Sequence, residues 1–197
     1  MSYKNRITII LIGICAFALF VSGTFAYFTS TATATSQNIV STTVEIEISE
    51  YTLENGERIP FPAEGFENVM PSQKVSKIVE IKNVGGTDAW IRVKADATFK
   101  VGENTLPSTI TVGSNSEKCI IIAPNENDWE LMDDGYYYCK ASLADGDTVL
   151  FIEEAQFNNA LPNEYADANA NLTVRAEAVQ SNYNGTSAAD ATGWPEP

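Results

Sequence analysis

Apolar and polar positions alternate with a period of two along several segments of the chain. In the clearest of them every second residue is apolar: Ala89, Ile91, Val93, Ala95, Ala97 and Phe99. Successive side chains of a β-strand point to opposite faces of its sheet, so this pattern predicts a strand with one buried face and one wet face. Shorter alternations over 44–48 and 172–178 predict two further half-buried strands.

Turn-rich stretches separate other short segments that also favour strands. These segments are Lys74–Lys82, Thr109–Val112, Lys118–Ile122, Gly135–Cys139 and Thr148–Ile152. Beyond the N-terminal region no segment carries an apolar stripe at helical spacing, and the best helical candidate is a short turn within 153–161. Roughly eight to ten short strands with few short helices predict an all-β chain. We expect one jelly-roll-like antiparallel β-sandwich over 27–181.

The N-terminal region has a different pattern, which is typical of an export signal. Lys4 and Arg6 precede the apolar stretch 7–21. That stretch is shorter than the about 20 residues that a membrane-spanning helix needs. The pattern predicts a signal peptide over the first 26 residues, cleaved between Ala26 and Tyr27. An uncleaved membrane anchor is the alternative; with cleavage, the mature protein is secreted.

Charge and composition narrow the function classes. The 197 residues contain 12 Lys and Arg against 26 Asp and Glu, which gives a net charge of −14 at pH 7. Such an acidic chain repels phosphates, so we expect no nucleic-acid binding. The chain has no histidine, which removes the commonest metal ligand and the usual proton shuttle of hydrolases. The sequence therefore predicts no catalytic, cofactor-binding or metal-binding residues.

Three cysteines are present, and Cys15 lies in the predicted signal. An even pair in an exported chain indicates a disulfide, here Cys119–Cys139. The segments around these cysteines both favour strands, so an antiparallel pairing of 118–123 with 136–141 would bring the thiols together. Closing this loop of about 20 residues would stabilise the fold by about 3 kcal/mol. Two free buried thiols are the alternative.

Several polar regions are candidates for binding. Three acidic pairs offer carboxylates to calcium, without the spacing of an EF-hand loop: Asp133 and Asp134, Asp145 and Asp147, and Glu153 and Glu154. A solvated acidic surface is the alternative reading. The long connections 50–72 and 163–169 are candidate binding or mobile loops. From residue 182 the chain is rich in Asn, Gly, Ser and Ala, which predicts a flexible C-terminal tail over 182–197.

The segment directly after the predicted cleavage site is uncharged. Residues 27–36 read YFTSTATATS, with small residues at the alternate positions Ser30, Ala32 and Ala34. Threonine and aromatic residues favour extended structure, and small residues fit a narrow groove. Such a strand either pairs within its own domain or, after cleavage, is donated to the open sheet edge of a neighbouring subunit.

Several of these motifs resemble those of a known family. Gly23–Thr29 resembles the signal class cut by the specialised SipW signal peptidase, in which Gly-Thr-aromatic-Ala precedes an aromatic mature start. Segments later in the chain are similar to the family pattern of a turn, a strand, Asn-x-Gly and further strands: 69–75, 81–89, Gly135–Tyr138 with Leu143 and Gly146, and 172–180. In this order they resemble the TasA/camelysin family of exported matrix-fibre proteins of Gram-positive bacteria.

The resemblance implies a jelly-roll-like β-sandwich that is a subunit of extracellular biofilm fibres. Subunits would join head to tail, each passing its N-terminal strand to the next. Residues 27–36 would be this donor strand, beginning with Tyr27, Phe28, Thr29, Ser30, Thr31 and Ala32. The implied partners are copies of the same chain, the signal peptidase during export, and other matrix or cell-wall components. The cysteine pair and the lack of a long lysine-rich tail depart from the TasA pattern.

Two other functions stay open at this point. Camelysin relatives have been called metallopeptidases, but without histidine only carboxylates and water could hold zinc, which is a poor ligand set for that metal. We therefore expect no enzymatic activity. A monomeric surface adhesion or ligand-binding module that uses the loop 50–72 is the third possibility.

Overall fold

The clearest alternating segment forms strand β5 (Ala89–Val101) inside an antiparallel sheet. The core-facing residues Ile91, Val93 and Phe99 are fully buried, whereas Thr98 on the other face is exposed. This confirms the predicted strand with one buried face. In the N-terminal half of β5 the other face is covered as well, by the C-terminal segment 181–195.

The structure is a computed structural model that describes residues 29–33, 44–67 and 70–195. Thirteen strands form antiparallel sheets in these residues, and the helical structure is a single 3-10 turn, η1 (Asn163–Tyr165). The predicted all-β class with few short helices is therefore confirmed. No helix in the described ranges is long and apolar enough to cross a membrane. The predicted export signal, its cleavage site at Ala26 and Tyr27, and Phe28 lie outside the described residues.

The larger sheet has six strands. Its order is β1 (Thr29–Thr33), β13 (Asn169–Gln180), β5, β11 (Tyr137–Cys139) and β10 (Trp129–Leu131), and β6 (Asn104–Leu106) also pairs with β5. β13 pairs with β5 along its whole length, so the two longest strands form the centre of the sheet.

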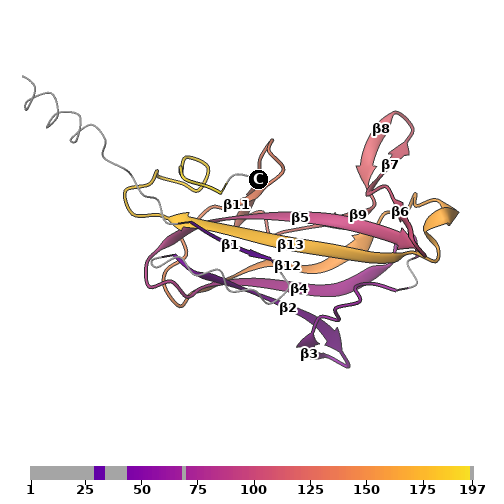
Figure 1. Cartoon of the computed structure of the whole chain (residues 1–197), viewed down its shortest axis with the longest axis horizontal. Helices are drawn as coiled ribbons and strands as arrows, with labels where there is room; N and C mark the ends of the chain where they lie inside the picture. Colours follow the sequence, from indigo (N-terminus) through magenta and orange to yellow (C-terminus); the bar gives the residue numbers. More distant parts are fainter. Residues whose placement is uncertain (1–28, 34–43, 68–69, 196–197) are drawn as a thin grey trace, which may run out of the picture.

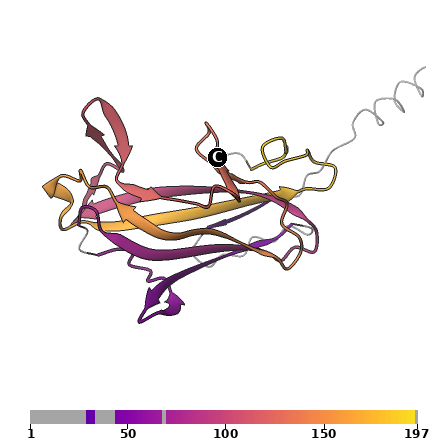
Figure 2. The ribbon, with the colours of Figure 1, turned by 180° about the vertical axis from the view of Figure 1, so that it is seen from behind.

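The second sheet has five strands. Its order is β3 (Glu57–Pro60), β2 (Ile46–Glu54), β4 (Lys74–Asn83), β12 (Thr148–Phe157) and β9 (Ile120–Ile122). A separate hairpin consists of β7 (Thr109–Val112) and β8 (Asn115–Lys118). The β2–β3 and β7–β8 hairpins project from opposite sides of the body (Figures 1 and 2).

The two large sheets lie face to face and enclose one apolar core (Figure 1). Rings from the two sheets meet edge to face across this core: Phe99 of β5 and Phe157 of β12 have centroids 6.3 Å apart. Trp129 of β10 and Phe151 of β12 have centroids 5.2 Å apart. Such edge-to-face pairs contribute about 0.5–1.5 kcal/mol each beyond their buried area, so they help to hold the layers together.

The predicted helical turn within 153–161 is largely wrong, because strand β12 continues to Phe157. Ala155 and Phe157 point into the core and pair with β9, and this tertiary packing outweighs the local signal. The one helical turn, η1, lies just after Pro162. A helical turn was expected in this region, but it forms on the other side of the proline.

The C-terminal segment 181–195 also differs from the expected flexible tail. Ala188 is 1% exposed and Asn184 2% exposed, and both lie on the outer face of the six-stranded sheet. The Asn184 side chain donates to the carbonyls of Gln180 and Thr192 and accepts from the Thr192 amide. One buried amide therefore folds the segment back onto the sheet.

Candidate assembly interface

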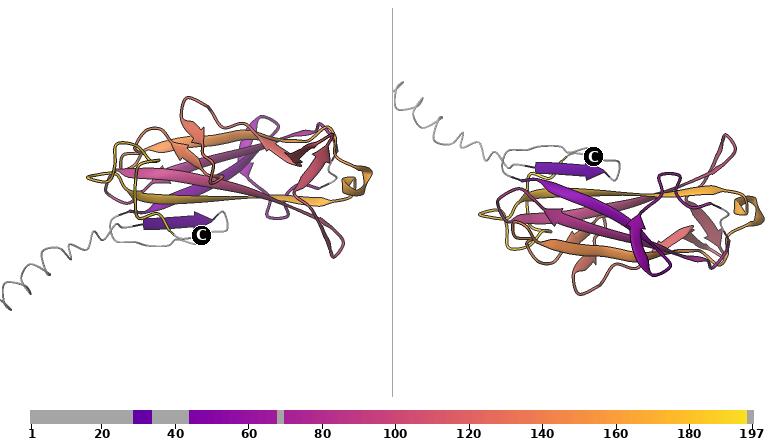
Figure 3. Two further views of the ribbon diagram at one scale, coloured as in Figure 1. Left: turned by 90° about the horizontal axis from the view of Figure 1, so that it is seen from above. Right: turned by 90° about the horizontal axis from the view of Figure 1, so that it is seen from below.

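Residues 29–33 of the predicted donor segment 27–36 lie at the margin of the six-stranded sheet, and its other residues lie outside the described part of the chain. β1 pairs antiparallel with β13, and the register runs from Thr29 opposite Val179 to Thr33 opposite Arg175 (Figure 3). β1 has β13 as its sheet neighbour and also lies near β2 of the other sheet. The structure thus places Thr29, Ser30, Thr31 and Ala32 of the predicted donor strand on an edge of the sandwich.

Every second residue of β13 directs its main-chain amide and carbonyl to the side away from β5, where β1 lies. The amide and carbonyl of Ala170 bond to Phe66, on the side of β13 away from β5. By strand alternation the even-numbered residues of β13 direct their amides and carbonyls to the same side. Gly65 permits the Phe66 contact, because a Cβ there would lie 2.5 Å from the Ala170 carbonyl oxygen. The β13 edge is therefore shared between the Phe66 bridge and β1.

Small residues line the core side of this edge. Ala176 and Ala178 are fully buried in the core. In the register, Ala176 lies opposite Ala32 and Ala178 opposite Ser30. Ser30 and Ala32, two of the small residues at alternate positions of the predicted donor strand, therefore stand opposite alanines of β13.

The outer face beneath the C-terminal segment holds a buried ion pair. Arg92 of β5 and Glu177 of β13 are register partners, and they are 8% and 1% exposed. The Arg92 Nε donates to Glu177 Oε2 at 2.7 Å and Nη2 lies 2.6 Å from the same oxygen. The other carboxylate oxygen accepts from the Tyr136 hydroxyl at 3.2 Å and lies 3.4 Å from Arg175 Nε. Both oxygens of this buried carboxylate are thus satisfied.

The guanidinium of Arg92 is also held between aromatic rings. Its Cζ lies 4.1 Å from the centroid of Tyr136 and 4.8 Å from that of Trp194. It donates further bonds to the Tyr138 hydroxyl and to the Pro195 carbonyl. Burial by itself lowers the pKa of Arg92, but the bonds to Tyr138 and Glu177 outweigh it and raise the pKa above its ordinary value. The group therefore carries its charge permanently and ties β5, β13 and the C-terminal segment together.

The predicted disulfide is not formed. Cys119 and Cys139 are both buried free thiols. The expected pairing of their strands is wrong: β9, which follows Cys119, pairs with β12 in one sheet, whereas β11 pairs with β5 and β10 in the other. The Cys119 thiol donates to the Pro107 carbonyl instead. Burial raises the pKa of both thiols, which makes them less reactive.

The three predicted acidic pairs remain apart from one another. Asp134 accepts from the Tyr138 hydroxyl and caps a turn at the Tyr136 amide. Asp147 accepts from the Asn83 amide through its main chain, and Glu154 forms an ion pair with Lys74. Within the described ranges, no group of three or more His, Cys, Asp or Glu side chains comes together to hold a metal ion.

The long connection 50–72 is partly regular. It contains the end of β2, all of β3, and the Phe66 bridge to Ala170. The second connection, 163–169, contains η1 with its buried Tyr165, whose hydroxyl donates to the Pro107 carbonyl. Both connections therefore contribute buried side chains to the fold.

Sequence reasoning missed the cluster around Arg92 and Glu177. Both residues occupy polar positions of predicted strands, where a solvated face was expected. Only the register between β5 and β13 makes them neighbours. No model of a protein family, no curated protein and no solved structure matches the chain.

Proposed function

We propose that the protein is an exported structural subunit that assembles into extracellular fibres by exchanging its N-terminal strand. The observation that supports this most is the position of β1, which pairs with one strand at the margin of the sheet. A strand held at an edge can be replaced by the same strand of a neighbour without any change in the contacts. Head-to-tail exchange of this kind produces an open filament.

The chain order supports a jelly-roll-like arrangement. From β4 onward the chain passes repeatedly between the two large sheets, in the order β4, β5 with β6, β9, β10 with β11, β12 and β13, with the β7–β8 hairpin outside both. A jelly roll follows such a path, because its two Greek keys cross repeatedly between two sheets. In this arrangement β1 completes the margin of one sheet, as a donated strand would.

Cleavage of the predicted signal peptide is consistent with strand exchange by β1. Cleavage between Ala26 and Tyr27 would leave two residues ahead of β1, so the strand would become a free N-terminus. We propose a SipW-type signal peptidase for this step, secretion to the cell surface or matrix, and copies of the chain as the main partner. The role is structural rather than enzymatic, and the absence of histidine supports this.

Charge adds a condition on assembly. The chain carries −14, and loss of Lys4 and Arg6 with the signal makes the mature form −16. Like charges keep the subunits apart at long range, whereas strand pairing acts at short range. Salt screens charges over about 10 Å at 0.1 M, so we expect faster fibre growth at higher salt.

A cross-linking experiment tests the exchange. Thr33 and Arg175 are register partners, and they form a pair without mutual hydrogen bonds, whose Cα atoms lie about 4.5 Å apart, within reach of a disulfide. The mature chain with Cys119→Ala and Cys139→Ala would carry Thr33→Cys and Arg175→Cys, and would be oxidised after incubation at high salt. Exchange predicts a ladder of reducible multimers on a denaturing gel.

The control moves one cysteine out of register, with Thr33→Cys and Thr173→Cys. This pair should give little cross-linking of either kind. A cross-linked monomer as the sole product of the matched pair would show that β1 stays in its own chain. Equal filament formation by chains starting at Tyr27 and at Thr42 would also contradict the proposal, because the second chain lacks the strand.

A further inference from the structure

The side of the sandwich opposite β1 has an opening between its two sheets. β11 pairs with β5 at Arg92 and Val93, and β6 pairs with it only from Phe99 onward. Between these points no described strand pairs with β5 on the side away from β13. Strand β9, the last strand of the other sheet, pairs with β12 alone in the described chain. Two unpaired edges therefore border the same gap.

The gap reaches the core. Core-facing residues of β5 on either side of it, Val93 and Phe99, are fully buried, but Ala95 and Ala97 between them are partly exposed. The cleft has a volume of about 90 Å³, and its apolar lining is Ala95, Ala97, Ile120, Ile122 and Leu172. This is smaller than the ~150 Å³ cavity that accepts benzene. One aliphatic side chain of the size of valine would fill it.

Main-chain groups on both borders are directed to the gap. The odd-numbered residues of β5 direct their amides and carbonyls away from β13, as the bonds between Ala89 and Leu143 show. Ala95 and Ala97 therefore present theirs to the opening. Directly before β9, the Cys119 carbonyl accepts from the Asn158 amide on the β12 side. By alternation, the amides and carbonyls of Ile120 and Ile122 are directed away from β12. An extended strand is the ligand that matches such rows of donors and acceptors.

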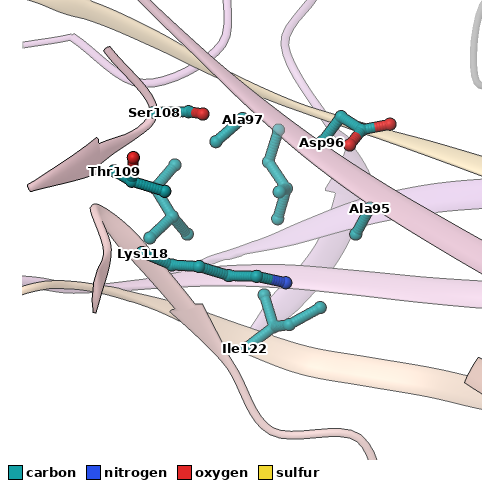
Figure 4. Close-up of a pocket in the computed structure, with 9 residues that line it drawn as sticks. Ala95, Asp96, Ala97, Ser108, Thr109, Lys118 and Ile122 are labelled. Carbon is teal, nitrogen blue, oxygen red and sulfur yellow. The ribbon is translucent and has the colours of Figure 1, made fainter. Parts of the chain in front are cut away.

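The charged groups at the mouth nearly cancel. Asp96 lies on one border and Lys118 on the other, and both line the cleft. Figure 4 shows the Lys118 side chain extended across the mouth, with its amine between Ala95 and Ile122. Lys118 is exposed and has no ion-pair partner among the residues that the structure describes, so it can move aside. An uncharged strand is therefore favoured over a charged one.

We propose that this cleft is a docking site for an extended, uncharged strand of a partner protein, which inserts one aliphatic side chain beside Ala97 and Ile122. The residues 27–36 of a second copy are a poorer match, because they carry only Ala, Ser and Thr after Phe28. The site lies away from the β1–β13 edge and does not depend on fibre formation. A matrix subunit with this cleft would recruit a second protein by strand addition.

Amide hydrogen exchange measured by NMR on the mature chain tests the proposal. The probe is a capped peptide, Thr-Ser-Thr-Val-Thr-Ser-Thr, and its control has Asp in place of Val. Alone, the amides of Ala95, Ala97 and Ile122 should exchange quickly, since none has a described main-chain partner. With the valine peptide at about ten times its Kd, exchange at these amides should slow about tenfold. The aspartate peptide should leave it unchanged.

Two variants sharpen the result. Ala97→Leu fills the cleft from its own strand and should abolish the protection, whereas Thr98→Leu on the opposite face should keep it. Amides of β13 report whether each variant is folded. The proposal would be overturned if the valine peptide protected Ala97→Leu as much as the parent chain, or if it did not protect the parent chain at all. Stronger protection by the peptide of residues 27–36 would also overturn it, because the cleft would then accept the chain's own donor strand.

Discussion

Two buried ion pairs occupy different parts of the molecule and differ in how well they are satisfied. Arg92 and Glu177 lie on the outer face of the six-stranded sheet under the C-terminal segment, with hydrogen bonds to both carboxylate oxygens. Lys77 and Glu50 lie on β4 and β2 of the other sheet, beside Phe61. Glu50 is less buried than Glu177, with 15% of its side chain exposed against 1%, and the two pairs also differ in their number of hydrogen-bond partners.

The second pair depends on one close contact. Lys77 is 1% exposed, its Nζ lies 2.9 Å from Glu50 Oε1, and the Phe61 centroid is 3.8 Å away. The Glu50 Oε1 oxygen is buried and has no well-directed hydrogen bond among the described groups. Desolvation raises the pKa of Glu50 and lowers that of Lys77, and in each case it outweighs the attraction to the partner. Each group is thus easier to neutralise than in water.

Burial of opposite charges does not by itself stabilise a fold. Removing two charges from water costs several kcal/mol each, and only good geometry with further hydrogen bonds offsets that cost. The Arg92 cluster meets this condition and connects three segments of the chain. The Lys77 pair does not, so we expect the two pairs to respond in opposite ways when they are replaced.

The largest effect is expected at Arg92. Arg92→Leu leaves the Glu177 carboxylate buried without its main partner. Such a change typically costs about 3–5 kcal/mol, so we expect the free energy of unfolding to fall by about that amount. Urea unfolding of the mature chain measures it. Lys94→Leu, on the same face of β5 but partly exposed, is the control and should change the free energy of unfolding by about 0.5 kcal/mol. Equal losses in both variants would show that the cluster has no special role.

The next effect has the opposite sign. Replacing a poorly satisfied buried pair by apolar residues is often neutral or stabilising by about 1–4 kcal/mol. We therefore expect the double variant Lys77→Met with Glu50→Leu to unfold at equal or higher urea concentration than the parent. The matched double variant Arg92→Met with Glu177→Leu should be less stable, because Tyr136, Tyr138 and Arg175 then lose their partner. Destabilisation of both double variants would remove the distinction between the pairs.

These pairs also show which parts of the fold can be predicted from the sequence. Alternation predicted β5, the start of β2 and much of β13, because the period of side chains along a strand is local. The ion pairs and the fate of Cys119 and Cys139 depend on which strands become neighbours and in which register. That information is non-local, and the sequence pattern does not contain it.

The C-terminal segment illustrates the same limit. Its composition is typical of a flexible tail, yet Asn184 and Trp194 find partners on β5, far away in sequence: the Asn184 carbonyl accepts from the Trp90 indole, and the Trp194 ring covers Arg92. The position of β1 against β13, in contrast, was one of two outcomes that the sequence left open. The composition of residues 27–36 predicted an extended strand, but it did not predict that β13 would be its neighbour.

A smaller effect is expected when the cover of the Arg92 cluster is removed. Trp194→Ala takes away one ring that packs on the guanidinium. A cation–π contact of this kind contributes about 0.5–2 kcal/mol depending on its exposure, and we expect a loss of stability in this range in urea unfolding. Tyr183→Ala is the control, since that ring is fully exposed. A loss as large as that of Arg92→Leu would mean that the cover, not the ion pair, dominates.

The smallest effect is a difference in pH dependence. Because the pKa of Glu50 is raised in the folded state, the folded chain binds more protons than the unfolded one just above the ordinary value of 4.5. The stability of the parent relative to the Lys77→Met and Glu50→Leu variant should therefore fall as the pH rises through that window. The lowered pKa of Lys77 has the opposite sign, so this relative stability should rise again as the pH approaches 10.5. Urea unfolding of both proteins across this range should give a minimum at intermediate pH, whereas a maximum there would mean that the attraction between Lys77 and Glu50 outweighs their desolvation.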